Sequence, residues 1–264
     1  MQNSKYMSKV KGHALVLGGS GGIGSEIVRA FAANGVKKIS FTYGRNGVAA
    51  EKLAKELRRA GVKAYFAPVD QSDKSAVETF LDDAVRATGE EIAIAVNAIG
   101  ISPNKDLEQQ TLETTGGGPD DKGWRDVFEV NVFGCFISTR AIAERMKKKR
   151  VKGSIVLITS TNGINSQSSI SVHYDASKAA QSHMMRILAE HYAPHVRING
   201  VAPGWIDTQM NATLPASERR KEMKKIWTGR FAEPHEVAKF IVFISGDGGS
   251  YTYGQNFMVD GGYR

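Results

Sequence analysis

The stretch HALVLGGSGGIG, residues 13–24, decides the fold of this chain. Its first five residues are an apolar run of the kind that forms a buried strand, and the glycines that follow favour a turn. Gly18, Gly22 and Gly24 allow that turn and let backbone N–H groups approach a pyrophosphate at the start of a helix. The alternative for this turn by itself is a tight strand–helix connection that binds nothing.

The rest of the chain repeats the alternation of strand and helix. The segment VAAEKLAKELRRAG, residues 48–61, has apolar residues three and four apart and a final glycine, which is typical of a helix. Further apolar runs predict strands at 37–43, 63–69, 92–96, 153–159, 195–201 and 256–260. We therefore predict an α/β fold in which residues 1–264 form a single Rossmann-type domain, a doubly wound parallel seven-stranded sheet with helices on both faces.

Composition limits the classes of protein that the chain can belong to. With 264 residues, 41% hydrophobic and 23% charged, it can bury the core of one large domain. Cys135 is its single cysteine, which excludes an internal disulfide framework and favours a reducing, cytoplasmic location. The N-terminal stretch lacks the apolar run of a signal peptide, and no run approaches the roughly 20 residues of a membrane span. The net charge of +8 favours an anionic partner or an evenly solvated basic surface.

The end of the second predicted strand bears on the choice of cofactor. In dinucleotide-binding sheets an acidic residue at this place accepts hydrogen bonds from the ribose of NAD and repels a 2′-phosphate. The sequence FTYGRNG has no acidic residue here and offers Thr42 and Arg45, which favours NADP(H) over NAD(H). Arg45 could equally be a solvated loop residue. Asp70, after the third strand, is placed either to meet the adenine or to cap the next helix.

A tyrosine and a lysine stand four residues apart in HYDASKAA, residues 173–180. On a helix such residues share a face, so Tyr174 and Lys178 project into the same space unless both are merely exposed. We expect the ammonium to stabilise the phenolate and to lower the pKa of the phenol from about 10, which brings proton transfer within reach. Ser160 follows the fifth strand and can donate to a substrate carbonyl, and Asn131 adds a polar group in an otherwise apolar helix.

Seven motifs in order resemble those of the short-chain dehydrogenase/reductase family over nearly the whole chain. They are LGGSGGIG, VNAIG, VNVFG, ITS, YDASK, INGVAPGWIDTQM, and GRFAEPHEVA leading to VDGG. The chain departs from the family at Leu17, which replaces a threonine whose hydroxyl braces the turn. It also departs at Ala98, so that Asn97 alone carries a structural role that two asparagines usually share. The spacing from serine to tyrosine is one residue longer than the commonest one.

The resemblance implies an NADP(H)-dependent oxidoreductase that reduces a ketone to a secondary alcohol by hydride transfer. Tyr174 would protonate the carbonyl oxygen, Ser160 would orient the carbonyl, Lys178 would bind the nicotinamide ribose, and Asn131 would place a water in a proton relay. Ile206 and Thr208 would hold the carboxamide, whereas Gly21 stands where NADP-dependent relatives often have arginine. The implied cofactor-binding residues are Gly18, Ser20, Gly22, Ile23, Gly24, Thr42, Arg45, Asp70, Asn97, Gly100, Tyr174, Lys178, Pro203, Gly204, Ile206 and Thr208.

Within the family, the pattern is most similar to the bacterial 3-oxoacyl-acyl-carrier-protein reductases. These enzymes dock an acidic acyl carrier protein on a basic patch, and Arg150, in the run RMKKKRVKG, falls where one docking arginine lies. His195 stands near the place of the second docking arginine. The alternative for the run is a solvated helix end. We predict that residues 101–122 form a mobile loop near the active site and that residues 205–230 form a substrate lid.

Three functions remain open on the sequence. The first is a 3-oxoacyl thioester reductase, and the second is a dehydrogenase of the same class that acts on a free ketone, sugar or alcohol. The third is a non-catalytic dinucleotide sensor or nucleic-acid binder, which the combination of Ser160, Tyr174 and Lys178 and the lack of a nucleic-acid motif argue against. The helices expected at about 125–149 and 174–193 match those that relatives pair, so we expect a homodimer or homotetramer. The spacing of the histidines predicts no metal site.

Overall fold

The computed structural model of the chain describes residues 9–263, apart from 117, 119, 120 and 213. Its strands form one sheet in the order β3-β2-β1-β4-β5-β6-β7, and every neighbouring pair is parallel. The strands are β1 His13–Leu17, β2 Lys38–Tyr43, β3 Lys63–Pro68, β4 Ile92–Asn97, β5 Gly153–Ile158, β6 Val196–Pro203 and β7 Asn256–Val259. The predicted doubly wound, seven-stranded parallel sheet is confirmed, and each predicted strand overlaps the observed one.

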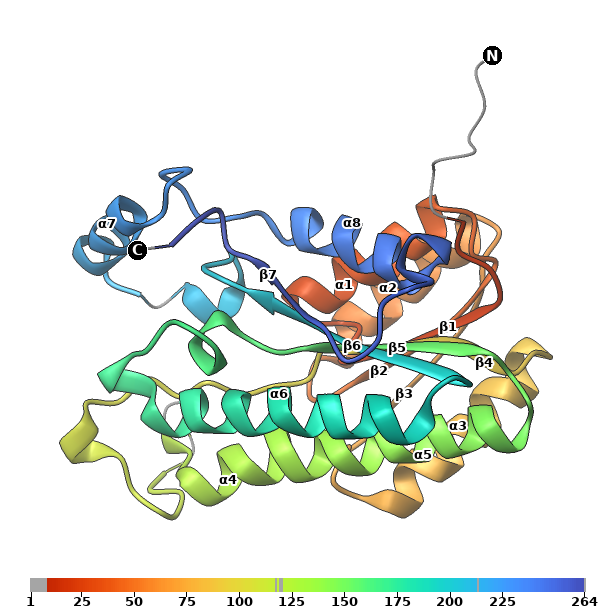
Figure 1. Cartoon of the computed structure of the whole chain (residues 1–264), viewed down its shortest axis with the longest axis horizontal. Coiled ribbons are helices and arrows are strands. Elements are labelled where there is room, and N and C mark those ends of the chain that lie inside the picture. Colours follow the sequence, from red (N-terminus) through yellow and green to blue (C-terminus); the bar gives the residue numbers. More distant parts are fainter. Residues whose placement is uncertain (1–8, 117, 119–120, 213, 264) are drawn as a thin grey trace.

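Helices cover both faces of the sheet (Figure 1). One face carries α1, α2 and α8, and the other carries α3, α5 and α6. The helices are α1 Gly22–Ala33, α2 Gly47–Arg59, α3 Lys74–Thr88, α4 Trp124–Phe128, α5 Cys135–Lys148, α6 Val172–Tyr192, α7 Ala216–Lys225 and α8 Pro234–Ser245. Among the described helices, none has the length and apolar character that a membrane crossing requires.

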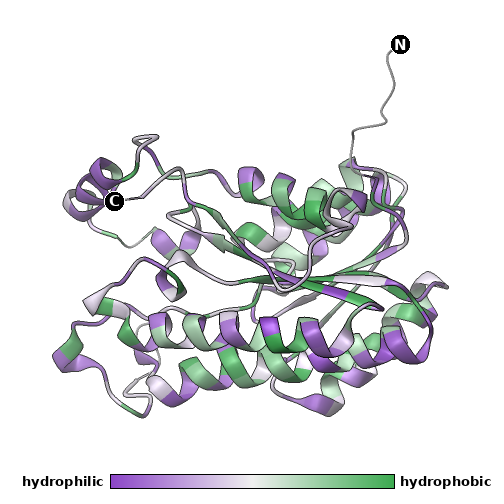
Figure 2. Ribbon diagram, viewed as in Figure 1, coloured by the Kyte–Doolittle hydropathy of each residue, from purple (hydrophilic) through white to green (hydrophobic). Residues whose placement is uncertain are grey.

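The core consists of two apolar clusters, one on each side of the sheet. Ala14 and Val16 of β1 pack in the cluster beneath α1, α2 and α8, whereas Leu15 and Leu17 pack in the cluster with α3, α5 and α6. Successive residues of a strand point to opposite faces, and both faces are covered here, which is why the run HALVL is apolar throughout. Figure 2 shows the hydrophobic residues concentrated in and around the sheet, while α7 is mainly hydrophilic.

A π-helical segment, Glu129–Gly134, joins α4 to α5. The helix predicted at about 125–149 is therefore present, but its backbone hydrogen bonds span five residues instead of four where it carries Asn131. Such π-helical turns are frequent at functional sites. The second predicted long helix, at 174–193, is observed as α6, which places Tyr174 in its first turn.

Candidate active site

Residues from separate motifs meet beyond the carboxyl ends of the central strands, around a cavity of about 430 Å³. Ser160, Tyr174 and Lys178 line this cavity. Parallel doubly wound sheets form their ligand crevices at this edge, because the turns after several strands converge there. Of the predicted cofactor-binding residues, the cavity is also lined by Ile23, Gly100, Pro203, Gly204, Ile206 and Thr208.

The glycine-rich turn leaves no room for side chains at Gly18, Gly22 and Gly24. Gly18 has a φ of 74°, in the left-handed region that glycine adopts without strain. A Cβ at Gly24 would collide with the Gly18 carbonyl, and one at Gly22 would lie 2.9 Å from the side chain of Thr208. No side chain caps the N-terminus of α1, so its first N–H groups remain available. This backbone cradle fits the pyrophosphate of a dinucleotide.

Thr42 braces the turn from the neighbouring strand. Its side chain is buried, and its Oγ1 accepts a hydrogen bond of 2.9 Å from the N–H of Gly18. This hydroxyl supplies the support that Leu17 cannot give. Thr42 therefore makes a bracing contact inside the protein, and its contact with the cofactor stays a prediction, because a hydroxyl that accepts this bond can still donate.

Two other residues predicted at the adenosine end lie on exposed loops. Arg45 is exposed just after β2, and its guanidinium forms no ion pair within the described residues. Asp70 Oδ1 accepts hydrogen bonds from the N–H and hydroxyl of Ser72, at 2.9 and 2.7 Å. Asp73 is the residue that caps α3, since its Oδ1 accepts from the N–H of Ala76 at 3.0 Å. The capping alternative for Asp70 is therefore wrong, and its adenine contact stays a prediction.

Asn97 is buried at the end of β4 and links neighbouring segments of the chain through hydrogen bonds. Its Nδ2 donates to Gln71 Oε1 at 2.8 Å and to Ser138 Oγ at 3.1 Å, and its Oδ1 accepts from the N–H of Ile99 at 3.0 Å. These bonds join three segments of the chain below the crevice. Because every polar atom of the side chain has a partner inside the protein, Asn97 supports the site from beneath.

The first turns of α6 bring Tyr174 and Lys178 beside Ser160. Ser160 lines the cavity with Tyr174 and acts to lower the pKa of the phenol, and Lys178 Nζ lies 5.7 Å from the centroid of the tyrosine ring. Lys178 and Ser160 are both buried, at 3% and 7% exposed. A Cβ at Gly100 would lie 3.4 Å from Lys178 Nζ, so this glycine stands beside the ammonium at the cavity wall.

The pKa of Tyr174 beside Lys178 differs from the prediction. Burial raises the pKa of Tyr174 to about 12, although its hydrogen bond with Ser160 acts in the opposite direction. Burial lowers the pKa of Lys178 to about 8. The predicted lowering of the tyrosine pKa by Lys178 is wrong for the protein alone, because the ammonium donates to the Ile158 carbonyl at 2.8 Å and to Gln181 Oε1 at 2.9 Å instead of to the phenol. Tyr174 is therefore protonated at neutral pH, which suits a proton donor.

Asn131 is fully buried in the π-helical segment. Its Oδ1 accepts from the N–H of Ile101 at 2.9 Å, and its Nδ2 donates to the carbonyl of the same residue at 2.9 Å and to Ser177 Oγ at 3.0 Å. The amide thus fastens the chain after β4 to α6, beside Tyr174 and Lys178. Its part in a proton relay stays a prediction.

Comparison with known proteins identifies the family. Residues 18–264 match the family profile described as Enoyl-(Acyl carrier protein) reductase. The chain is 34% identical to the sorbose reductase of Schizosaccharomyces pombe over 97% of this chain and 98% of that one. It is 31% identical to the 3-oxoacyl-[acyl-carrier-protein] reductase of Thermotoga maritima, over 94% of this chain and 96% of that one. The structure of a short-chain dehydrogenase/reductase from Serratia marcescens matches with a TM-score of 0.85 and 28% identity, over 97% of this chain and 98% of that one.

The chain belongs to the short-chain dehydrogenase/reductase family. It is accordingly an oxidoreductase that binds a nicotinamide dinucleotide and reduces ketones. No group of three or more histidine, cysteine, aspartate or glutamate side chains that could hold a metal ion occurs within the described residues.

A lip formed by residues 161–171 borders the cavity of this short-chain dehydrogenase/reductase. Asp175, next to Tyr174, holds the lip through hydrogen bonds from Asn162 Nδ2 and from the N–H of Ser168, each 2.7 Å long. Burial raises the pKa of Asp175, against these hydrogen bonds. The position of the lip thus depends on a carboxylate one residue away from the predicted proton donor.

The predicted loop at 101–122 is tied to this lip. The N–H of Lys105 donates to the carbonyl of Ile170 at 3.0 Å, and Gln110 Nε2 donates to the carbonyl of Ser169 at 3.0 Å. Residues 117, 119 and 120 of this loop lie outside the described residues, as does residue 213 of the predicted lid. Two stretches far apart in the sequence therefore form one rim of the cavity.

The opposite rim is α7, within the predicted lid at 205–230. Glu222 of α7 accepts hydrogen bonds from Trp205 Nε1 at 3.1 Å, from Lys225 Nζ at 2.6 Å and from the hydroxyl of Tyr263. Burial opposes the charge of Glu222, but the hydrogen bonds from Lys225 and Tyr263 outweigh it and lower its pKa. Glu222 and Tyr263 are not predictable as site residues from the sequence, because no local spacing links residues so far apart.

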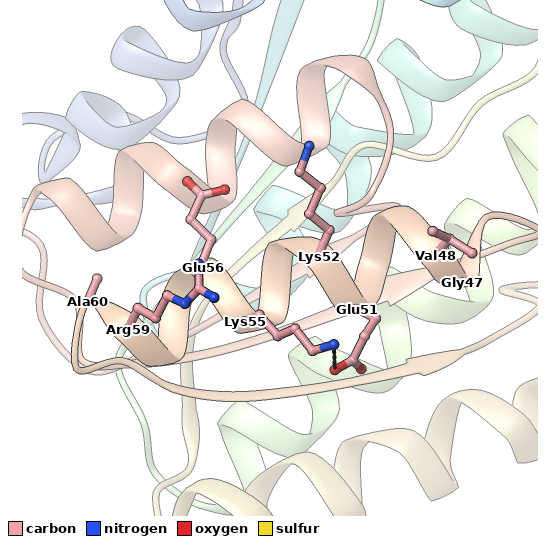
Figure 3. Close-up of a pocket in the computed structure, with 8 residues that line it drawn as sticks. All are labelled: Gly47, Val48, Glu51, Lys52, Lys55, Glu56, Arg59 and Ala60. Carbon is pink, nitrogen blue, oxygen red and sulfur yellow. Dashed lines mark ion pairs between the residues drawn. The ribbon is translucent and has the colours of Figure 1, made fainter.

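Two surface features lie away from this site. The connection between α5 and β5, which contains the exposed Arg150, is at the opposite end of the molecule from α7 (Figure 1). A shallow hollow of about 930 Å³ runs along the outside of α2 (Figure 3). Its charged side chains include the ion pair between Lys55 and Glu51, and none of the predicted site residues lines it.

Proposed function

We propose that this short-chain dehydrogenase/reductase is an NADP(H)-dependent reductase of a free ketone that carries several hydroxyl groups, as ketoses do. The polar outer end of the cavity supports this substrate class. Its rim presents amide, hydroxyl and carboxylate groups beside the apolar side chains of Ile170, Trp205, Met210 and Leu214. A pocket for an acyl chain would be expected to be lined mainly by apolar side chains. The polar lining includes Asn162, Gln167, Asn211, Glu218, Glu222 and Tyr263.

The reaction uses the carbonyl-facing pair Ser160 and Tyr174. Both side chains line the same cavity, so a carbonyl oxygen that enters between their hydroxyl groups receives two donors. Tyr174 then gives its proton to this oxygen as negative charge develops there. When bound, the nicotinamide supplies the hydride. Lys178 would bind the ribose hydroxyls and present its charge behind the phenol.

The preference for NADP(H) is supported by the end of β2. Arg45 is exposed there, has no ion-pair partner within the described residues, and follows a strand end that carries no carboxylate. An available guanidinium is well suited to bind a 2′-phosphate in a bidentate manner. Gly21 offers no second cation, so the preference depends on Arg45.

A 3-oxoacyl thioester is the second candidate substrate, supported by the basic run around Arg150 and by the similarity to the Thermotoga maritima reductase. The position of Arg150 argues against the thioester as substrate. Arg150 precedes β5 whereas Ser160 follows it, and a strand of six residues separates its two ends by roughly 20 Å. An acyl carrier protein docked at Arg150 would therefore face away from the cavity of the same chain.

The two candidates are separated by a substrate panel. Free ketoses, simple ketones and an acetoacetyl thioester are each offered with NADPH and with NADH. We expect the highest kcat/KM for a ketose with NADPH. Preferred turnover of the acetoacetyl thioester would reject the ketose and support the second candidate, and equal use of NADH would reject the cofactor preference.

We further propose a cytoplasmic homodimer or homotetramer. The helices expected to pair expose apolar side chains, with Phe133 at 53%, Phe136 at 37% and Ile187 at 56% exposed. Large exposed apolar side chains gathered on neighbouring elements are typical of protein interfaces. Light scattering on a purified sample should give a multiple of the chain mass of 28.7 kDa, and a monomer at micromolar concentration would reject the assembly.

A further inference from the structure

The ammonium of Lys178 is held by a side chain that the reaction described above does not use. Gln181 is fully buried, one turn further along α6, and its Oε1 accepts a hydrogen bond of 2.9 Å from Lys178 Nζ. Its Nε2 donates to the sulfur of Cys135 on α5 at 3.1 Å. An ammonium can only donate, so the amide oxygen must be the end that faces Lys178. The orientation of Gln181 is therefore determined at both ends.

We propose that Gln181 is a positioning residue that aims the Lys178 ammonium at the active-site cavity. This inference rests on the proposed function, in which Lys178 assists reduction of the ketone. An ammonium has three N–H bonds in a tetrahedral arrangement. The Ile158 carbonyl and Gln181 occupy two of them, at 2.8 and 2.9 Å, so the third bond is directed away from both acceptors. Lys178 also lines the cavity, which makes the cavity the place where this third bond is available.

Within the described residues, no carboxylate that faces Lys178 competes with Gln181 for the ammonium. The titratable groups that face the ammonium are Tyr174 on α6 and Cys135 on α5, and burial raises the pKa of both. Both groups are therefore neutral at neutral pH. A buried charge needs acceptors to replace the water that it has lost. Gln181 supplies one of the two acceptors found within the described residues.

The test compares three variants of the full chain. Gln181→Leu removes the acceptor at similar volume, and Gln181→Glu replaces it with a charged acceptor of the same shape. Met185→Leu is the control, because Met185 is fully buried one turn further along the same face and has no hydrogen bond to Lys178. Thermal unfolding followed by circular dichroism verifies that each variant folds. If Gln181→Leu does not fold, the comparison of Gln181→Glu with the wild type decides.

The first readout is the titration of Lys178 in the protein without cofactor, measured by the 13Cε shift in lysine-labelled protein. The signal is assigned by its loss in Lys178→Met. Because Gln181 stabilises the charged form, its removal should shift the titration midpoint to lower pH, and Gln181→Glu should shift it to higher pH. Met185→Leu should leave it unchanged. A midpoint that stays in place in a folded Gln181→Leu variant would overturn the inference.

The second readout is the pH profile of reduction with the preferred ketone. Gln181→Leu should lower kcat/KM about tenfold or more at neutral pH, the loss expected for one hydrogen bond to a charged group, and should move the alkaline limb in the same direction as the titration. Unchanged kcat/KM in Gln181→Leu would overturn the positioning role. If the wild type reduces no ketone, the proposed function fails, while the titration still shows whether Gln181 holds the ammonium.

Discussion

At the scale of single residues, burial shifts the pKa of Tyr174 more strongly than the neighbouring charge of Lys178 does. Spacing along the helix correctly brings Tyr174 and Lys178 together, and the order of motifs brings in Ser160. Spacing does not reveal the direction of the pKa shifts, because desolvation depends on everything that packs around a side chain. Gln181 escapes detection for the same reason, since its partner Cys135 is on another helix.

The charge of Lys178 should set the alkaline limit of activity. Burial lowers its pKa to about 8, so the ammonium is present below that pH and is lost as the pH rises through it. We expect kcat/KM for ketone reduction to fall above about pH 8. Lys178→Arg should be less active at neutral pH but should lack this alkaline limb, because a guanidinium keeps its charge. A limb that persists in Lys178→Arg would assign it to another group.

Arg45 should control the choice between the two cofactors. Arg45→Ala removes an exposed guanidinium from the end of β2. The dissociation constant of NADPH should then rise by roughly tenfold or more, while that of NADH changes little, since only NADPH carries the 2′-phosphate. Binding is measured by quenching of tryptophan fluorescence. Arg59→Ala, another exposed arginine at the end of α2, is the control. Equal effects on the two cofactors would refute the phosphate contact.

At the scale of elements, the strands and the glycine turn follow from the sequence while the rims of the cavity do not. Apolar runs between polar helices predict each strand because both faces of the sheet are buried. The rims are determined by long-range contacts, such as the one between Lys105 and Ile170 or the one between Glu222 and Tyr263, which leave no periodic pattern. The π-helical segment is likewise absent from the pattern, which indicates only a helix at that place.

The turn from β1 to α1 should tolerate no side chain at Gly24. Gly24→Ala places a Cβ against the Gly18 carbonyl, so we expect it to lower the free energy of unfolding by about 1–3 kcal/mol and to weaken cofactor binding. Gly44→Ala is the matched control, because a Cβ there meets no atom within 4 Å. It should change stability by less than about 0.5 kcal/mol. Chemical denaturation of both variants checks this, and equal stability would contradict the steric account.

At the scale of the whole molecule, the sheet order is what creates the site. The order β3-β2-β1-β4-β5-β6-β7 places the turns after β1, β4, β5 and β6 side by side, so residues from Ile23 to Thr208 surround one crevice. The family motifs predict this assembly well. The substrate is harder to predict, because its end of the cavity is built from the lip at 161–171, the loop at 101–122 and α7. Their contacts become visible only in the folded chain.

The most direct measurement is single-turnover oxidation of NADPH by the wild type, Tyr174→Phe and Tyr192→Phe with the preferred ketone. Tyr174→Phe removes the hydroxyl that shares the cavity with Ser160, whereas Tyr192→Phe removes one that is bonded to Glu144, far along α6. We predict that Tyr174→Phe binds NADPH as the wild type does but transfers hydride about 10²–10⁴-fold more slowly, and that Tyr192→Phe remains active. Hydride transfer by Tyr174→Phe at the rate of the wild type would contradict the account.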